Sequence, residues 1–494
     1  MVALQLTPHQ NEAFQKLKDF TKAADSRAFI LRGYAGTGKT TLLGQYAEWL
    51  DRAGYKPVLL ATTGRAAKVL QNKTGIEAKT LHSCIYQFDE LDGMEEQAAG
   101  EQLTLQFGLR KHPQYEEPPV YIVDEASMIP NTALTGGQVA NFGSGHILMD
   151  FLDFTEGRKI IFVGDPCQLP PVSKETFSPA LSPRYLRDEY KVPVQYAELV
   201  EIIRQGADSE ILTLAGRFRA DIVAGRYVKW PKVAVPAGRQ AHLLPNEHVL
   251  VKAYMKHLEK KAYGKALMIT NANGHCRRLN HKLRMQLMGN KNLAEGELLM
   301  VVQNSYYVPL TNGDQVVVKK VKPAGKAAGF NFLEVELEDV GGTRKYETLL
   351  IRELLYNDYA GLQADESRRL IIDFDQRMRK KRVKRKSDAY KQAMRNDPYL
   401  NALRAKFGYV ITCHKAQGGE WPNVYLNVQK SVFVQQRNAL YRWFYTALTR
   451  ASDNLYLNDN FWIEGFNRRQ PKVAAQQFRK SQGRNKKYER RSRK

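Results

Sequence analysis

A glycine-rich stretch that ends in Lys39 and Thr40 holds the residues of this chain best suited to phosphate chemistry. It reads Gly-Tyr-Ala-Gly-Thr-Gly-Lys-Thr from residue 33, after an apolar run at 28–31 and before helical spacing at 42–50. Glycines let backbone N–H groups curl around phosphates, and the start of a helix adds partial positive charge. This order of strand, loop and helix predicts a nucleoside triphosphate site in which Lys39 reaches the β- and γ-phosphates and Thr40 holds Mg²⁺. The residues expected to contact the nucleotide are Gly33, Gly36, Thr37, Gly38, Lys39, Thr40 and Thr41.

Two acids, Asp124 and Glu125, close a second apolar strand at 120–123. A hydrolytic phosphate site needs a carboxylate in the magnesium shell, the role expected of Asp124. It also needs a general base for the attacking water, the role expected of Glu125. For such a pair taken alone, a solvated strand end is the alternative, and the upstream phosphate loop favours the catalytic interpretation.

A third apolar strand, at 160–163, runs into Gly-Asp-Pro-Cys-Gln-Leu-Pro-Pro. Gln168 in this segment is a candidate for sensing the γ-phosphate or the hydrolytic water. The alternative is a structural turn rich in proline.

The formal net charge is +24, from 75 basic and 51 acidic residues in a chain of 494. This excess predicts a polyanionic partner. The cations concentrate at 377–386 and in a tail at 468–494, and the tail has little of the apolar face that membrane binding requires. Nucleic acid is therefore the favoured partner, although a solvated helix face remains an equal alternative for 377–386.

The sequence gives no sign of a membrane or a secreted protein. No run approaches the roughly 20 apolar residues of a membrane span, and the first residues lack a basic-then-apolar signal. The four cysteines lie far apart, which predicts reduced thiols rather than a zinc or iron–sulfur site. We therefore expect a cytoplasmic protein.

The spacing of apolar runs predicts an α/β fold built on parallel sheets, with the ligand at the carboxyl ends of the strands. The polar stretch from Glu90 to Glu117 interrupts this pattern and is interpreted as a hairpin, because residues 103–107 alternate at the period of a strand. A second α/β segment begins near residue 201 and is interrupted by short β-type runs and charged helices. Strands are expected in the α/β segments at 29–32, 57–62, 120–123, 159–163, 266–270, 409–412 and 424–428.

The order of three motifs resembles that of superfamily 1 helicases. Gly-x-x-x-x-Gly-Lys-Thr at 33–40 is followed by Asp-Glu-Ala-Ser at 124–127 and by Gly-Asp-x-x-Gln-Leu-Pro-Pro-Val at 164–172. The chain looks most like the RecD-like and phage Dda-type group, whose members move 5′ to 3′ on single-stranded DNA. The resemblance spans about residues 5–455, with small departures at Thr63 and Cys413 that remove no catalytic residue.

This resemblance implies two RecA-like P-loop domains, with a small β-barrel and helical insertion in the second. The implied boundaries are 1–200 for the first domain, with a pin-like insertion at about 88–118, and 201–295 plus 404–465 for the second. The inserted segment would occupy 296–403, and a basic, disordered tail would occupy 466–494.

The resemblance also implies roles for residues outside the phosphate loop. Gln10, in Leu-Thr-Pro-His-Gln at 6–10, would contact the base. Arg204 and Arg450 would contact the γ-phosphate, Arg450 as an arginine finger. Further nucleotide contacts would come from Gln417, Gly418 and Glu420. The residues implied to contact DNA are Thr62, Thr63, Arg65, His82, Thr412 and His414.

The whole pattern implies a DNA helicase that uses ATP and Mg²⁺, translocates 5′ to 3′ on single-stranded DNA and unwinds tailed duplex as a monomer. Lys39 and Glu125 on one lobe and Arg204 and Arg450 on the other would couple hydrolysis to lobe movement. Three alternatives stay open: a translocase that does not separate strands, a nucleic-acid-binding module without catalysis, and an RNA substrate. The pathway, whether repair, recombination or replication, and the protein partners are not readable from the sequence.

Overall fold

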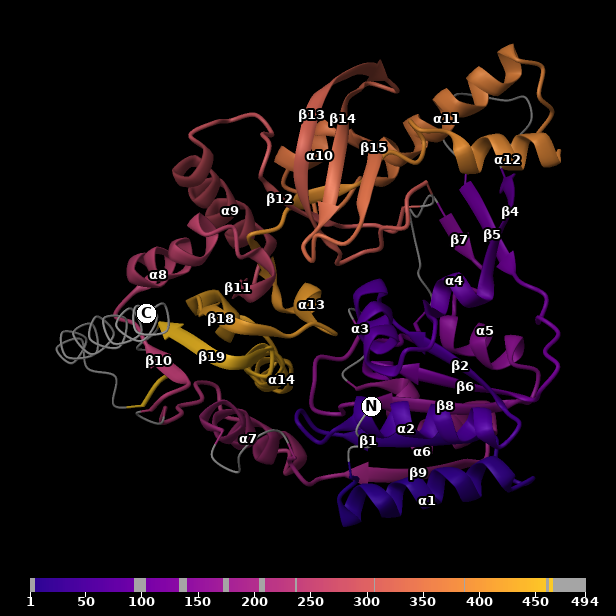
Figure 1. The fold of residues 1–494 in the computed structure, drawn as a ribbon, viewed down its shortest axis with the longest axis vertical. Coiled ribbons are helices and arrows are strands. Elements are labelled where there is room, and N and C mark those ends of the chain that lie inside the picture. The colour runs from indigo at the N-terminus through magenta and orange to yellow at the C-terminus, as the bar shows by residue number, and fades with distance from the viewer. Residues whose placement is uncertain are drawn as a thin grey trace, which may run out of the picture. The chain divides into compact units, whose positions relative to one another are not determined.

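The computed structural model describes residues 5–92, 104–132, 140–171, 177–203, 209–235, 238–305, 307–385, 387–458 and 462–464. The chain folds into two compact units, the first of residues 1–207 and 290–408 and the second of residues 208–289 and 409–494 (Figure 1). The inserted segment is flanked in sequence by the second unit, but its contacts join it to the first. Arg204 and the basic tail lie outside the described residues.

The first unit is built on six parallel strands in the order β3-β2-β6-β8-β1-β9. The apolar runs of the sequence form the central strands, as expected for a parallel sheet covered on both faces. The strands are β1 (Ala28–Gly33), β2 (Lys56–Ala61), β3 (Ala78–Thr80), β6 (Pro119–Asp124), β8 (Lys159–Gly164) and β9 (Val194–Leu199).

Helices cover both faces of this sheet, and the alternation of side chains along each strand divides the core in two. Phe29 and Leu31 pack with α1 (Pro8–Lys22), α2 (Lys39–Arg52) and α3 (Gly64–Thr74). Ala28 and Ile30 point to the opposite face. That face is covered by α4 (Leu81–Ile85), α5 (Ile147–Phe154) and α6 (Pro183–Tyr190).

The second unit has a sheet of five parallel strands in the order β10-β19-β18-β11-β17. Its strands are β10 (Ala241–Leu243), β11 (Ala266–Thr270), β17 (Val410–Thr412), β18 (Trp421–Asn427) and β19 (Ala451–Asn458). Helices α8 (Glu247–Glu259) and α9 (Asn273–Met288) lie on one side of the sheet. On the other side lie α7 (Glu210–Val223) and α14 (Arg437–Leu448), and the short α13 (Cys413–Ala416) follows β17 (Figure 1).

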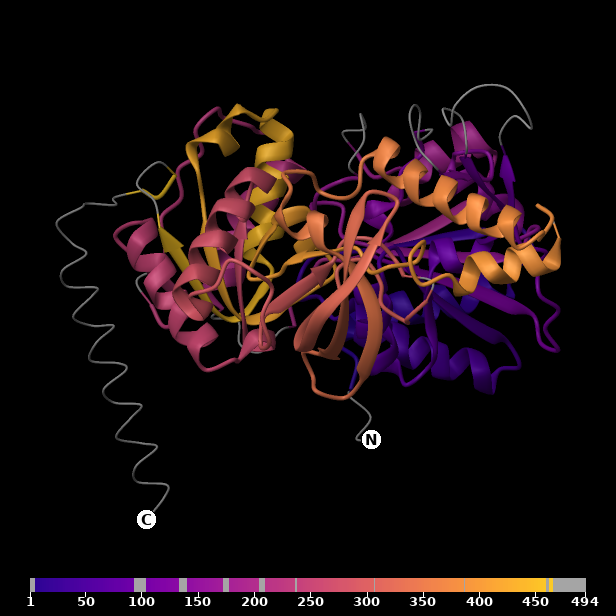
Figure 2. The same ribbon diagram turned by 90° about the horizontal axis from the view of Figure 1, so that it is seen from above.

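The inserted segment forms an antiparallel sheet in the order β15-β14-β13-β12-β16. A bridge between Leu350 and Leu403 links its two edges, which gives the barrel-like closure that the resemblance implied. Helices α11 (Ala364–Lys380) and α12 (Asp388–Asn396) extend from it over the N-terminal part of the same unit (Figure 2). The remaining elements are β12 (Leu298–Val301), β13 (Gln315–Ala327), β14 (Phe330–Asp339), β15 (Lys345–Ile351), α10 (Arg352–Tyr356) and β16 (Ala405–Phe407).

A three-stranded sheet of β4 (Tyr86–Asp92), β5 (Thr104–Leu109) and β7 (Ala140–Phe142) stands between the first sheet and helices α11 and α12 (Figure 1). β4 and β5 are the predicted hairpin, and the residues between them lie outside the described part of the chain. Leu105 packs against both the core of the first sheet and the core of the inserted segment. The hairpin is therefore part of the first unit's packing. No helix of the described residues is long and apolar enough to cross a membrane.

Glu247 at the start of α8 is expected to stabilise the second unit in a pH-dependent way. Its carboxylate accepts two hydrogen bonds from Arg278, at 2.9 and 3.0 Å, and one each from Asn427 and Gln429. Burial opposes ionisation, but these donors lower the pKa of Glu247 to about 2. Because the folded-state pKa lies below the unfolded one, this stabilisation is complete above about pH 4.5 and is lost as the pH falls towards 2.

We therefore expect Glu247→Gln to lower the free energy of unfolding at pH 7, measured by urea titration, with the difference from the unaltered protein shrinking between pH 4.5 and 2. Glu259→Gln, at the exposed end of the same helix, is the control and should change little. A difference that does not vary with pH would contradict the assignment.

Candidate active site

The phosphate loop joins β1 to α2, and its glycines are required by its shape. Gly36 and Gly38 have φ of 82° and 75°, in the left-handed region that side chains disfavour. A Cβ on Gly38 would lie 2.4 Å from Nε2 of Gln10. The Thr37 hydroxyl, buried in the loop, donates to the carbonyl of Tyr34 at 2.8 Å. The loop is thus a tight cradle of backbone groups.

Lys39 lies across the mouth of this loop. Its ammonium donates to the carbonyls of Gly33 and Tyr34, at 2.6 and 3.0 Å. A Cβ on Gly33 would lie 2.8 Å from Cγ of Lys39, so a larger residue there would displace the lysine. Glycine at this position leaves room for the lysine beside the phosphate-binding backbone, where anionic oxygens can replace the carbonyls as partners of its ammonium.

Gln10 connects the start of α1 to the phosphate loop. Its Oε1 accepts from the N–H of Thr7 at 3.1 Å, and its own N–H donates to the Thr7 hydroxyl, which closes a capping box. Its Nε2 donates to the carbonyl of Thr37 at 3.2 Å. Gln10 therefore positions the loop, a role that the sequence pattern did not predict, while its contact with a base stays a prediction.

Asp124 and Glu125 sit at the carboxyl end of β6, in the same sheet as the phosphate loop. Glu125 has φ of 53° in the left-handed region, a strained conformation for a residue with a side chain. Its N–H donates to Oδ1 of Asp124 at 2.8 Å, and its carbonyl accepts from the Thr62 hydroxyl at 3.3 Å. Burial raises the pKa of Asp124, against the opposing effects of the Glu125 N–H and the charges of Lys39 and Lys73.

The segment after β8 brings Gln168 to the same edge of the sheet. Asp165 is fully buried, and its Oδ1 accepts from the N–H of Cys167 at 2.9 Å. Its carbonyl accepts from the N–H of Gln168 at 3.3 Å, and the side chain of Gln168 is buried. The proline-containing segment is therefore a structured turn that holds Gln168 near the strand ends, so the structural and functional interpretations are compatible.

The strand β9 and the residues after it complete the surroundings of the loop, which sequence reasoning missed. The Tyr34 hydroxyl donates to Glu198 at 2.6 Å, and the N–H of Ile203 donates to the carbonyl of Gly36 at 2.9 Å. The strand signal at 194–199 is weak because Gln195 and Tyr196 interrupt its apolar pattern, so the sequence did not reveal this contact. Arg204 follows Ile203 and lies outside the described residues.

The predicted DNA-contacting residues of the first unit lie at the starts of α3 and α4. Thr63 caps α3 by accepting from the N–H of Ala66. His82, in α4, packs its ring against Tyr86 and Phe142, at centroid distances of 5.8 and 5.9 Å. Burial lowers the pKa of His82, so the imidazole is neutral at pH 7.

The start of α3 is also docked on the inserted segment, through the loop at 311–315. Nη1 of Arg65 donates to Gln315 at 3.4 Å, and Lys68 forms an ion pair with Asp314 at 2.7 Å. A Cβ on Gly64 would overlap the side chain of Thr311 at 1.7 Å. Arg65 thus belongs to an interface within the first unit, which the sequence did not predict.

The second unit carries the other predicted site residues on the segment from β17 to β18. Thr412 ends β17 and is buried, and burial lowers the pKa of His414 in α13. Gln417 is buried, Gly418 has φ of 70°, and Glu420 is exposed. Residues 412–420 thus form one bend between β17 and β18.

Arg450 fixes that bend to the end of α14. Its Nε donates to the carbonyl of Thr446 at 3.0 Å, and its Nη1 donates to the carbonyl of Gly419 at 2.9 Å. Its Nη2 donates to the Thr449 hydroxyl at 3.2 Å, and the side chain is 6% exposed. Three of the five guanidinium N–H donors are used in this way, and within the described residues the other two remain for a further acceptor.

In the first unit the structure brings together the phosphate loop, Gln10, Asp124, Glu125 and Gln168 at the carboxyl ends of parallel strands, where ligands bind in α/β sheets. A lysine ammonium, a pair of carboxylates and a glycine-rich cradle of backbone groups are the parts that phosphoryl transfer requires.

Two protein-family models match the chain. A model described as an AAA domain matches residues 5–230, which include the phosphate loop, the two acids and Gln168. A model described as a UvrD-like helicase C-terminal domain matches residues 407–458, which include the bend from Thr412 and Arg450.

Several known proteins are similar to parts of the chain. The conjugal transfer protein TraA of Agrobacterium fabrum is 28% identical over 188 residues, 38% of this chain and 13% of that protein. The ATP-dependent RecD2 DNA helicase of Deinococcus radiodurans is 31% identical over 152 residues, 30% of this chain and 17% of the helicase. The chain spans 13–14% of the length of the TraA proteins it matches. Among solved structures, the Pif1 helicase from Bacteroides in complex with ADP-AlF3 and ssDNA covers 97% of this chain and 98% of its own, with 16% identity and a TM-score of 0.48.

Proposed function

We propose that this chain, which belongs to the superfamily 1 helicases, is an ATP-driven motor that moves 5′ to 3′ along single-stranded DNA and unwinds duplex DNA. The single observation that carries the proposal is the arrangement of Lys39, Asp124 and Glu125 at one edge of the first sheet. A binding module has no need of a general base beside a phosphate cradle, whereas a hydrolase does.

The residues of the first unit divide the chemistry among them. The loop N–H groups and Lys39 bind the β- and γ-phosphates and stabilise the charge of the transferring group. Glu125 takes a proton from the attacking water, and Gln168 reports the state of the nucleotide. A hydroxyl and a carboxylate, from Thr40 and Asp124, are oxygen ligands of the kind that Mg²⁺ prefers. Mg²⁺ bound there would neutralise phosphate charge.

Residues of the second unit complete the proposed cycle. Arg450 approaches the γ-phosphate when ATP is bound and withdraws after hydrolysis, which moves one unit against the other. Arg204, which belongs to residues 1–207 of the first unit, is proposed to contact the γ-phosphate from the side of the phosphate loop. Gln417, Gly418 and Glu420 contact the nucleotide. Because Arg450 also ties down the bend at Gly419, its movement is expected to shift Thr412 and His414 with it.

Single-stranded DNA is proposed to bind through phosphate contacts and base stacking, without reading sequence. In the first unit the contacts come from Thr62, Thr63, Arg65 and His82. A neutral imidazole at His82 suits a hydrogen bond or a stacking contact rather than a charge contact with phosphate.

The direct test is unwinding of a fluorescent duplex that carries a single-stranded tail on either its 5′ or its 3′ side, with ATP and Mg²⁺. We expect opening of the 5′-tailed substrate alone, and no opening with Glu125→Gln. Opening of the 3′-tailed substrate alone would reverse the proposed direction. ATP hydrolysis stimulated by single-stranded DNA without any opening would identify a translocase, and stimulation by RNA but not DNA would change the substrate.

A further inference from the structure

The turn between helices α11 and α12 carries a group of exposed cations that the proposed site does not use. We call Lys380, Lys381, Arg382 and Lys384 the basic turn; all four side chains are exposed. Within the described part of the chain, none of these four side chains has a hydrogen bond, an ion pair or an aromatic ring as a partner. Their positive charge is therefore available to a ligand from outside the chain.

Three of the acids near the basic turn, Asp373, Asp375 and Asp397, are neutralised by other arginines, whereas Asp388 at the start of α12 is exposed. Asp375 pairs with Arg379 at 2.9 Å and with Arg385 at 2.7 Å. Arg377 pairs with Asp373 at 2.8 Å and donates two hydrogen bonds to Asp397. Each of these acids thus has an arginine partner, and the basic turn keeps its full charge.

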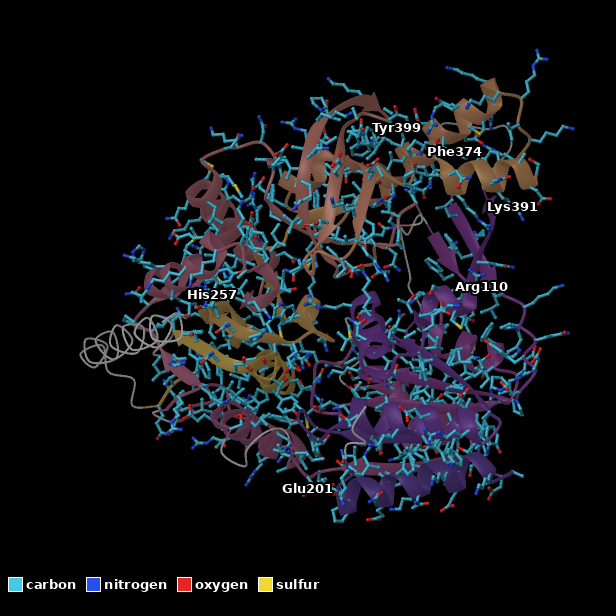
Figure 3. The ribbon with its side chains drawn as sticks, viewed as in Figure 1. Arg110, Glu201, His257, Phe374, Lys391 and Tyr399 are labelled. Carbon is cyan, nitrogen blue, oxygen red and sulfur yellow. The ribbon has the colours of Figure 1, made fainter. Side chains whose placement is uncertain are left out.

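Backbone hydrogen bonds hold the basic turn in one conformation. The N–H groups of Arg382 and Val383 donate to carbonyls in the last turn of α11, at 2.9 and 3.0 Å. Arg382 has φ of 56°, a strained conformation that the neighbouring contacts must maintain. Arg377 is itself clamped between the rings of Phe374 and Tyr399, which are labelled in Figure 3. A fixed backbone lowers the entropy cost of presenting several cations to one ligand.

Two simpler explanations do not account for the whole group of charges. Cations favour the last turn of a helix because of its dipole, which explains Lys380 and Lys381, but that effect fades within one turn, and Arg382 and Lys384 lie beyond the end of α11. Membrane binding would need an apolar face beside the charge. The apolar faces of α11 and α12, with Phe374, Met378 and Tyr390, are buried in the core of the inserted segment.

We propose that the basic turn binds the phosphate backbone of double-stranded DNA, as a site separate from the single-strand contacts. The inference rests on the proposed function, because a chain that separates strands must meet duplex that is not yet open. The position of the basic turn agrees with this role. Helices α11 and α12 belong to the core that Leu105 contacts, and Leu105 lies in the hairpin β4–β5, the pin-like insertion implied by the family resemblance (Figure 1). Binding through phosphates alone requires no base sequence.

The chain offers a matched control for the test. Lys319, Lys320 and Lys322 lie on β13 of the same inserted segment, and each pairs with a glutamate of β14 at 2.7–3.0 Å. Replacing either set of three lysines by glutamine removes the same net charge from the same part of the molecule. Only the set in the basic turn removes cations that have no partner.

The experiment compares Lys380→Gln/Lys381→Gln/Lys384→Gln with Lys319→Gln/Lys320→Gln/Lys322→Gln. Binding of a blunt-ended duplex and of an oligothymidine is measured by fluorescence anisotropy without nucleotide, over a range of salt concentrations. For the basic-turn variant we expect duplex affinity to fall about tenfold or more near 0.1 M salt, and the log–log salt slope to fall by about 2 to 3. Oligothymidine binding and the ATP hydrolysis that it stimulates should not change.

Equal losses of duplex affinity in the two variants would show a general charge effect and overturn the proposal. An equal loss of oligothymidine binding would place the basic turn on the single-strand track and overturn it as well. Unaltered duplex binding in the basic-turn variant would also overturn the proposal, even if the protein unwinds DNA. Because binding is measured without ATP, a protein that never unwinds can still give the expected result, so failure of the proposed function is seen separately.

Discussion

Replacing Glu125 by glutamine is expected to lower DNA-stimulated ATP hydrolysis by about 10² to 10⁴-fold, because the attacking water loses its general base. The amide has nearly the same shape as the carboxylate, so the left-handed backbone at this residue and the N–H bond to Asp124 should remain. Lys39 and the loop glycines are unaffected, and ATP should bind as well as before. Steady-state hydrolysis and equilibrium binding of a fluorescent ATP analogue measure the two properties.

The control for this variant is Glu117→Gln. Glu117 is exposed and lies just before the start of β6, at the opposite end of the strand that carries Glu125. It should hydrolyse ATP at the unaltered rate. If Glu125→Gln also keeps most of its activity, another group takes the proton, and the assignment of the base is wrong.

The other large effect is expected at Arg450. If its two remaining donors stabilise the γ-phosphate in the transition state, Arg450→Lys should lower ATP hydrolysis by about 10³ to 10⁵-fold, since a lysine cannot reproduce the fork of a guanidinium. The same change breaks the bonds to Thr446, Thr449 and Gly419, and it should lower the midpoint of thermal unfolding.

The two effects can be separated because one belongs to catalysis and the other to folding. Hydrolysis is measured well below the unfolding midpoint, and tryptophan fluorescence gives the folded fraction. The control is Arg437→Lys, because Arg437 is exposed at the start of the same helix. Loss of hydrolysis in a fully folded Arg450→Lys protein is the expected result. A lower midpoint with normal hydrolysis would leave Arg450 a structural role alone.

The elements that were predictable are those whose signal is local. The buried strands β1, β2, β6 and β8 read directly as apolar runs, and the phosphate loop is specified by its glycines and by the strand and helix beside it. β9 was missed because Gln195 and Tyr196 interrupt its apolar pattern at the edge of the sheet. β3 was missed because three residues are too few to show alternation.

The contacts between distant segments were not predictable. Nothing near Thr311 or Asp314 in the sequence indicates that they receive the start of α3, because that docking depends on the three-dimensional fit of Gly64 against Thr311. Arg450 and Gln10 were assigned by family resemblance to the nucleotide, and their bonds to Gly419 and Thr37 appear only in the fold. Packing of this kind depends on shape, which a pattern of residue types does not record.

The strand order of the second sheet also determines when that sheet can form during synthesis. β10 and β11 are made early but are not neighbours, because β18 and β19 lie between them. Their partners are completed only when the ribosome has passed Asn458, after the whole inserted segment has been made. Until β17 and β18 have been made, the apolar strand Ala266–Thr270 has no neighbouring strand to pair with, and α8 packs against it. A growing chain that stalls between residues 290 and 409 therefore exposes the strand edges that invite aggregation.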